Sequence, residues 1–410
     1  MASVLLMQHS SAKLSMAFSQ VGHSFSHIFM LLYPTVVLAL EKEFHQSYGQ
    51  LLVLMTLGNV LFGVAALPAG WLGDRWSTLG MMVVYFFGLG AAAIFTGFMS
   101  TTSGLVIGLA LIGLFASIYH PVGMAWLVKN AENKGKALGF NGVFGSLGVA
   151  SAALIAGVLT DWISWRAAFI VPGVIALVVG IALAYCVRRG LVVESFSDVA
   201  PQIKPPANDM KRVFIVLSFT MILNGLIYQS VSSALPKILA EGVPHWSGGS
   251  TSGAGTLVSI VYLFAMGASL IGGYLSDRYS VKHVYMIATL LQAPLYALAA
   301  SLMHAPLLFT VILATMLNTI AVPTENVLLT RYTPDRWRAT AFGAKFVLAL
   351  GLGAMGVPLV AYIHDHTGNF YAFYMLLALI AVLIAAIAIW LPASKKRREP
   401  EQRLAAQTMP

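Results

Sequence analysis

Gly70-Trp-Leu-Gly-Asp74-Arg75-Trp-Ser77 and Gly273-Tyr-Leu-Ser-Asp277-Arg278-Tyr-Ser280 are two copies of one short charged motif. The copies lie 203 positions apart in a chain of 410 residues, and each stands between two long apolar runs. Weaker similarities, between 134–140 and 336–342 and between 167–169 and 371–373, repeat at nearly the same offset. The sequence therefore predicts a duplicated unit, with one copy in each half of the chain.

The composition is that of a membrane protein. Hydrophobic residues make up 58% of the chain and charged residues 10%, and the mean hydropathy is +0.81. A soluble protein has roughly a quarter charged residues, whereas helices that face lipid must be apolar around their whole circumference. The single cysteine, Cys186, excludes an intramolecular disulfide and indicates no cysteine-based metal site.

The apolar runs have the length of membrane-spanning helices, which need about 20 residues each. They predict an all-α membrane protein with twelve transmembrane helices in two pseudo-symmetric six-helix bundles. The predicted spans are 15–40, 48–72, 78–98, 103–128, 137–159, 165–187, 212–239, 251–275, 281–302, 305–330, 339–363 and 369–391. The predicted units are an N-terminal bundle (1–187), a cytoplasmic linker (188–211), a C-terminal bundle (212–391) and a basic cytoplasmic tail (392–410).

Basic residues gather on one side of these spans. Of the 24 lysines and arginines, all but Lys42, Arg166, Lys237 and Lys345 fall in the termini or in the loops on the same side as the termini. By the positive-inside rule, both termini are cytoplasmic. The net charge of +9 is therefore a topology signal and predicts no nucleic-acid partner. The short loops favour a plasma membrane of bacterial inner-membrane type.

The twelve spans and the repeated Gly-x-x-x-Asp-Arg motif resemble the major facilitator superfamily over essentially the whole chain. The resemblance implies that the motif, between the second and third helices of each half, gates the cytoplasmic side. The gating residues that it implies are Gly70, Asp74, Arg75, Gly273, Asp277 and Arg278. Within the superfamily, Ser26-His27 and His120-Pro121 look like the fosmidomycin-resistance type of exporter.

Several ionisable residues fall inside the spans, where a charge costs several kcal/mol unless it has a partner, a water-filled cavity or a function. His23 and His27 are one helical turn apart on the same face, and His120 comes at about the depth of His23. In the resembled fold these helices line the cavity, so the three imidazoles are expected in one wet chamber between the bundles. Each histidine could instead form a structural hydrogen bond.

The second half has its own intramembrane charges. Glu325 and Lys345 lie at similar depth on helices that neighbour each other in the resembled fold, and an ion pair would offset much of their desolvation cost. This pair is expected either to couple transport or to serve only as an internal strut. Uncharged residues expected at the substrate cavity are Tyr33, Asn224, Tyr228 and Gln229.

These features predict a secondary active transporter that works by alternating access. No phosphate-binding loop or catalytic motif is present, so the chain is not expected to be an enzyme or to use ATP. No cofactor or resident metal is predicted. Protons are the expected coupling ion, because histidine titrates near physiological pH. The expected partners are the lipid bilayer and a small-molecule substrate, and the expected state is a monomer.

The substrate is less constrained. Proton-coupled export of a drug or metabolite, by antiport, is the first interpretation. Proton-coupled uptake of a small organic anion is an alternative, since Lys345 and protonated histidines would attract a carboxylate or phosphonate. Transport of a metal or metal chelate is a third, because three histidines can bind a transition metal. A membrane receptor or scaffold without transport is the alternative of a different class.

Overall fold

The computed structural model describes residues 2–131, 133–193, 207–333 and 338–392, and every regular element in them is a helix. The first half contains α1 (Ala2–Leu31), α2 (Tyr33–Phe44), α3 (Tyr48–Leu52), η1 (Val53–Met55), α4 (Thr56–Val64), α5 (Ala66–Arg75), α6 (Thr78–Gly97), α7 (Thr102–Ala116), η2 (Tyr119–Gly123), α8 (Met124–Asn130), α9 (Lys134–Trp162) and α10 (Ala167–Arg188). The second half contains α11 (Ala207–Gly242), α12 (Pro244–Ser247), α13 (Thr251–Arg278), α14 (Val281–Ala299), α15 (His304–Tyr332), α16 (Arg338–Phe346), η4 (Val347–Leu352), η5 (Gly353–Met355), α17 (Gly356–Thr367) and α18 (Tyr371–Ala388).

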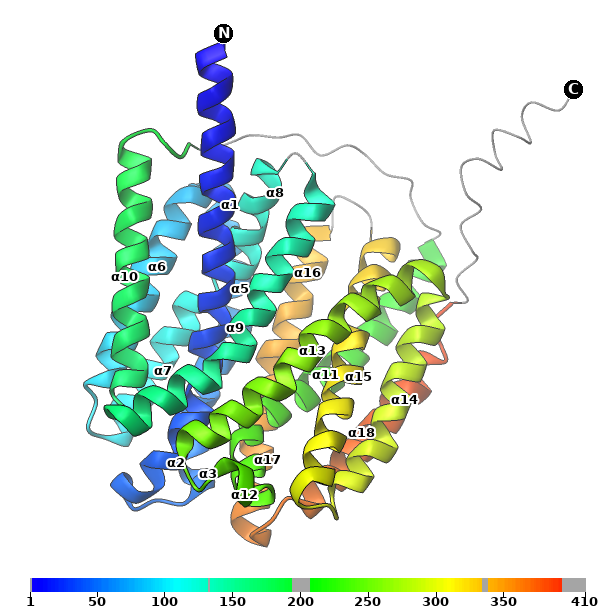
Figure 1. Ribbon diagram of the computed structural model, residues 1–410. Coiled ribbons are helices and arrows are strands. Elements are labelled where there is room, and N and C mark those ends of the chain that lie inside the picture. Colours follow the sequence, from blue (N-terminus) through cyan, green and yellow to red (C-terminus); the bar gives the residue numbers. More distant parts are fainter. Residues whose placement is uncertain (1, 132, 194–206, 334–337, 393–410) are drawn as a thin grey trace, which may run out of the picture.

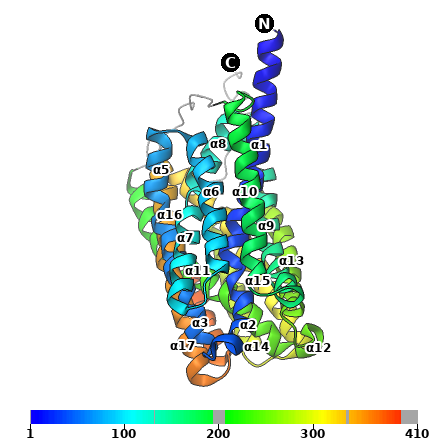
Figure 2. The same ribbon diagram turned by 90° about the vertical axis from the view of Figure 1, so that its left-hand side faces the viewer.

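Within these described ranges, eleven helical stretches are long and apolar enough to cross a membrane. The remaining predicted span, the ninth (281–302), corresponds to α14, which has 19 residues and packs along α15 and α18. Lys282, His283 and Gln292 make α14 more polar than its neighbours. The all-helical membrane fold is thus the predicted one. Figures 1 and 2, turned by 90° from each other, show the long helices running in one general direction.

The largest differences from the predicted boundaries are at the start of the first helix in each half. The first span was predicted from residue 15, but α1 is helical from Ala2. The seventh was predicted from residue 212, but α11 begins at Ala207, inside the predicted linker. Residues 194–206 of that linker and the tail from 393 onward lie outside the described residues. The division into the four predicted units stays a prediction.

Small residues bring the two halves into close contact. α9 packs along α13, where an added Cβ at Gly157 would overlap the backbone of Thr251, and one at Gly255 would overlap that of Ala153. The second contact joins α4 to η4. Close backbone approach through small residues is the usual packing mode of membrane helices. In Figure 1 the first half lies on the left and most of the second half on the right, with α16 and α17 between them.

Short π-helical segments interrupt two of the spans. Tyr119–Gly123 (η2) and Val347–Leu352 (η4) are π-helical, with a wider turn than the α-helix. Pro121 lies inside η2 and has no N–H to donate, which weakens the regular helix locally. Pro34, in the first turn of α2, follows a break between α1 and α2 at Leu32. Pro323 lies within the continuous α15. Such π segments occur frequently at functional sites.

Candidate substrate and proton site

The three intramembrane histidines of the first half form one cluster. His23 and His27 come from α1 and His120 from η2, and one ring nitrogen of each lies within 4.8 Å of the others. The Nε2 atoms of His23 and His27 are 3.3 Å apart, at hydrogen-bonding distance. His23 is buried, and His27 and His120 are partly buried. The structure therefore brings together the three side chains that the sequence singled out.

Neighbouring residues fix the orientation of the His23 ring. Its Nδ1 lies 2.8 Å from the backbone carbonyl of Asn141 on α9. A carbonyl only accepts hydrogen bonds, so Nδ1 carries the hydrogen and Nε2 of the neutral ring is an acceptor. The Tyr119 ring stacks on the His23 ring, with centroids 4.9 Å apart. The Tyr119 hydroxyl donates a hydrogen bond to Asn141 Oδ1 at 2.9 Å. A Cβ at Gly145 would overlap the ring, so α9 needs glycine there.

His120 links the cluster to the second half. Its ring stacks on Phe346, with centroids 4.9 Å apart and planes inclined by 21°. Phe346 is the last residue of α16 and directly precedes η4, so both π-helical segments meet at this contact. The rings thus pack against one another, Tyr119 and Phe346. Aromatic rings from both halves therefore contact the cluster, and its place in a wet chamber between the bundles stays a prediction.

The predicted ion pair is present in the second half. Lys345 Nζ lies 2.7 Å from Glu325 Oε1, with side chains 11% and 7% exposed. Lys345 also donates to Asn326 Oδ1 at 2.6 Å. Tyr285 donates its hydroxyl to Glu325 Oε2 at 3.3 Å and accepts a hydrogen bond from Asn224 Nδ2 at 2.6 Å. Each charge therefore has an opposite charge and at least one polar partner, as a buried pair requires.

The other predicted cavity residues are placed differently. Tyr33 is 1% exposed and donates its hydroxyl to the backbone carbonyl of Leu51, so it is a packed core residue in this conformation. Gln229 is buried, and its Nε2 lies 3.4 Å from the carbonyl of Leu350 in η4. Tyr228 is partly buried on α11. Of the four predicted residues, only Asn224 joins the network around Glu325.

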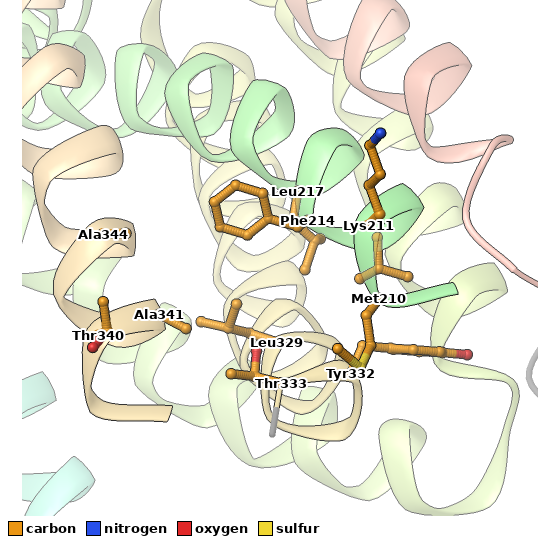
Figure 3. Close-up of a pocket in the computed structure, with 11 residues that line it drawn as sticks. Met210, Lys211, Phe214, Leu217, Leu329, Tyr332, Thr333, Thr340, Ala341 and Ala344 are labelled. Atoms are coloured by element: carbon orange, nitrogen blue, oxygen red, sulfur yellow. The ribbon is translucent and has the colours of Figure 1, made fainter. Parts of the chain in front are cut away.

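A cavity of about 420 Å³ lies between α11, α15 and α16, at the end of the molecule where α1 begins. Figure 3 shows Phe214, Leu217, Leu329 and Ala341 around it. The lining is mostly apolar, with hydroxyl groups from side chains such as Thr340. Ala344 in the wall precedes Lys345, and Leu329 is one turn beyond Glu325 on α15. Neither member of the ion pair lines the cavity itself, and none of the three histidines does.

At the opposite end of the molecule, which we call the α12 end, polar contacts hold the halves together. Lys237 of α11 binds both carboxylate oxygens of Glu41 on α2, at 2.7 and 3.0 Å. The Asp365 carboxylate of α17 accepts hydrogen bonds from the backbone N–H of Gly49 at 2.9 Å and from the Ser47 hydroxyl at 2.5 Å. The structure is therefore closed at the α12 end, while the cavity lies at the other.

The two copies of the repeated motif have matching local structure. Arg75 lies over the ring of Trp71 at 5.2 Å, and Arg278 lies over that of Tyr274 at 5.9 Å. Asp74 and Asp277 are exposed. A Cβ added at Gly70 would make a tight contact of 3.1 Å with Pro121 of η2, whereas one added at Gly273 would meet no atom within 4 Å. The first copy thus packs on the segment that holds His120, and a gating role for both copies stays a prediction.

Sequence reasoning missed several residues of these networks. Asn141, Tyr285, Asn326 and Phe346 all contact the predicted residues directly. Asn326 and Phe346 each adjoin a predicted residue in sequence, which is a usable signal. Asn141 is an amide in an otherwise apolar run, and such a group needs a buried partner. Tyr285 carries no comparable signal, because tyrosines are common in membrane helices.

The fold and these buried polar networks define a class: a polytopic helical membrane protein with two facing sets of helices and polar groups enclosed between them. The sequence pattern of the Major Facilitator Superfamily matches residues 17–254 and 217–409. The chain belongs to this superfamily. It is therefore a secondary transporter embedded in a lipid bilayer and moving a small molecule, and it is not an enzyme.

The chain is also similar to individual transporters. A "Probable 4-methylmuconolactone transporter" of Cupriavidus pinatubonensis is 24% identical over 357 residues, which cover 83% of this chain and 81% of the relative. A peptide transporter, POT, solved in complex with sulfate has a TM-score of 0.76 at 14% identity, over 93% of this chain and 95% of that one. A bacterial homologue of the human lysosomal transporter Spinster, inward-facing and unoccupied, has a TM-score of 0.68 at 14% identity, over 93% and 95%. The two structures support the fold.

Proposed function

We propose that this chain imports a small organic anion together with a proton across a bacterial inner membrane. The observation that carries the proposal is Lys345, a partly buried cation held by Glu325 at 2.7 Å and next in sequence to Ala344, which lines the mostly apolar cavity. With both termini in the cytoplasm, as the basic loops indicate, the cavity opens to the cytoplasm and the α12 end faces outside.

The ion pair provides a mechanism for coupling. When Glu325 takes up a proton, Lys345 loses its counter-ion in a buried site, and breaking such a pair costs about 3–5 kcal/mol. A substrate carboxylate that binds Lys345 restores the lost interaction. Because Glu325 can pair with Lys345 only when deprotonated, the anion and the proton are bound together. When Glu325 releases its proton toward the cytoplasm, the pair re-forms and displaces the anion into the cavity.

The histidine cluster supports the same cycle from the first half. His120 contacts Phe346, which adjoins Lys345, so rearrangement of the ion pair reaches the cluster through one residue. An imidazole that becomes protonated there adds positive charge close to the anion site. His23, His27 and His120 are therefore proposed as secondary proton acceptors, and Glu325 as the principal one.

The relative in Cupriavidus points to the substrate class. 4-Methylmuconolactone is a compact lactone that carries one carboxylate, which fits one buried lysine beside an apolar wall. We therefore place the substrate among small monocarboxylates with a ring or short carbon skeleton. At 24% identity, the relative supports the class of substrate and leaves the individual compound to experiment.

Export is a second candidate, favoured by a different observation. Ser26-His27 and His120-Pro121 look like the corresponding pairs in fosmidomycin-resistance exporters, and the structure brings both histidines together. In that case the same residues would exchange an outgoing anion or drug for an incoming proton. The two candidates differ in the direction of the proton gradient that accumulates substrate.

The test uses purified protein in proteoliposomes, with labelled 4-methylmuconolactone and benzoate as probes and a pH-sensitive dye inside. An acidic exterior should drive accumulation of the carboxylate and acidify the interior. Glu325→Gln should abolish gradient-driven accumulation but retain exchange of internal for external substrate. Lys345→Gln should abolish both. Glu43→Gln, which removes a surface pair with Arg166 within the first half, is the matched control and should transport normally.

Two results would contradict the import proposal. Unchanged accumulation by Lys345→Gln would show that this lysine does not hold the anion. Accumulation driven only by an acidic interior would identify an exporter.

A further inference from the structure

The histidine cluster has the geometry of a metal site. In a tetrahedral site with zinc–nitrogen bonds of about 2.0–2.1 Å, two ligand nitrogens lie about 3.3–3.4 Å apart. The Nε2 atoms of His23 and His27 are already 3.3 Å apart. All three histidines have a ring nitrogen within 4.8 Å of the others. The separations between the ligand nitrogens therefore exceed the tetrahedral value by roughly 1.5 Å at most.

The surroundings of His23 match those of a metal-binding imidazole. Metal-ligating histidines almost always donate the second ring N–H to a carboxylate, a backbone carbonyl or water, which fixes the ring and raises its basicity. Here Nδ1 of His23 donates to the carbonyl of Asn141 at 2.8 Å. Tyr119 then holds the Asn141 side chain by a hydrogen bond of 2.9 Å. The Nε2 lone pair of His23 is therefore directed toward His27 before any ion binds.

The donor set selects the kind of ion. Three neutral imidazoles suit Zn²⁺, Co²⁺, Ni²⁺ and Cu²⁺, whereas Mg²⁺ and Ca²⁺ need oxygen ligands. No carboxylate of a described residue belongs to the cluster. A site with three protein ligands leaves a fourth position open for water or an anion. Because His120 stacks on Phe346, the cluster adjoins the contact between the two halves.

We infer that His23, His27 and His120 bind one divalent transition-metal ion within the first half of the protein. The ion takes the nitrogen lone pairs that a proton would otherwise take, so it competes with protonation of the cluster. It also joins α1 to η2, the two segments that carry the ligands. This site is independent of the identity of the substrate and of the direction of transport.

The test is a titration of the full-length, tag-free protein in detergent with Co²⁺, followed by its visible d–d absorption. One equivalent should produce the intense bands of four-coordinate cobalt, and Zn²⁺ should remove them. His27→Gln and His120→Gln should each weaken binding by more than about a hundredfold, since even indirect partners of a ligand contribute 10–100-fold. Gly142→Ala, which meets open space on α9, is the structural control and should bind normally.

Four of the seven other histidines lie in pairs and need their own control. His245 and His304 have ring centroids 6.2 Å apart, and His364 and His366 lie close in sequence on α17. A variant with all four replaced by glutamine should give the same cobalt spectrum as the unmodified protein. The inference is overturned if the bands persist in both His27→Gln and His120→Gln, or if the unmodified protein shows only the weak bands of six-coordinate cobalt. Both cobalt results can be interpreted whether or not the protein is active in a transport assay.

Discussion

Replacing Lys237 with methionine removes the main ionic contact that closes the α12 end between the two halves. Lys237 of α11 binds both oxygens of Glu41 on α2, and it also lies 3.5 Å from Glu241, one turn further along α11. The side chains of Lys237 and Glu41 are 15% and 26% exposed, so the contact is only partly screened by water. When the α12 end opens, α2 and α11 separate and this contact is lost.

The size of the effect follows from that geometry. A hydrogen bond to a charged group contributes about 1.5–3 kcal/mol when one partner is removed from a sheltered site. Since about 1.4 kcal/mol corresponds to a factor of ten, Lys237→Met should shift the equilibrium between closed and open forms roughly 10- to 150-fold toward the open form. The contacts of Asp365 with Ser47 and Gly49 remain, so closure should be weakened and not abolished.

The assay measures distances between two spin labels in a Cys186→Ser background. Lys42→Cys on α2 and Trp246→Cys on α12 place labels at exposed positions of the first and second halves. Lys237→Met should enrich the long-distance population. Arg166→Met is the matched control: its salt bridge with Glu43, at 3.0 Å, lies at the same end but within the first half.

Arg166→Met should therefore leave the distance distribution unchanged, because its loss affects the closed and open forms alike. Equal distributions for Lys237→Met and Arg166→Met would refute the reasoning that this contact controls closure.

Three further predictions concern the buried site. Lys345→Met should lower the free energy of unfolding by about 3–5 kcal/mol, because it leaves the Glu325 carboxylate unpaired. Adding Glu325→Gln should recover most of this loss, as measured by thermal unfolding. If the two substitutions lowered the free energy of unfolding additively, direct coupling between the side chains would be excluded. Gly145→Ala should cost about 1–3 kcal/mol by displacing the His23 ring, whereas Gly142→Ala on the same helix should change the melting temperature little. Uptake of a carboxylate probe should rise as external pH falls, and Glu325→Gln should flatten that pH profile; a profile unchanged by the substitution would assign coupling to another group.

The sequence predicts the helices well because membrane crossing imposes a length on every apolar run. It also predicts which intramembrane charges belong together. His23 and His27 follow from one-turn spacing, and Glu325 and Lys345 follow from the cost of leaving either charge alone in an apolar environment. In each case a local pattern or a large energetic penalty limits the possible structures.

The contacts at the α12 end are beyond such reasoning. Lys237 and Glu41 are 196 residues apart, and Gly49 and Asp365 are 316 apart. In the sequence these charges resemble ordinary charges at helix ends, where solvent satisfies them without a specific partner. Only the relative position of the two halves makes them partners. The stacking of Phe346 on His120 was missed for the same reason, since Phe346 belongs to the other half of the chain.

The position of the two π-helical segments suggests why the ion pair and the histidines lie where they do. A π turn contains one residue more than an α turn, so a helix that contains it can change register locally without unfolding. Tyr119–Gly123 carries His120, and Val347–Leu352 directly follows Lys345 and Phe346. The stacked rings of His120 and Phe346 join these two adjustable segments across the halves. In the proposed cycle, a change in the charge of Lys345 or His120 would therefore act next to these two segments.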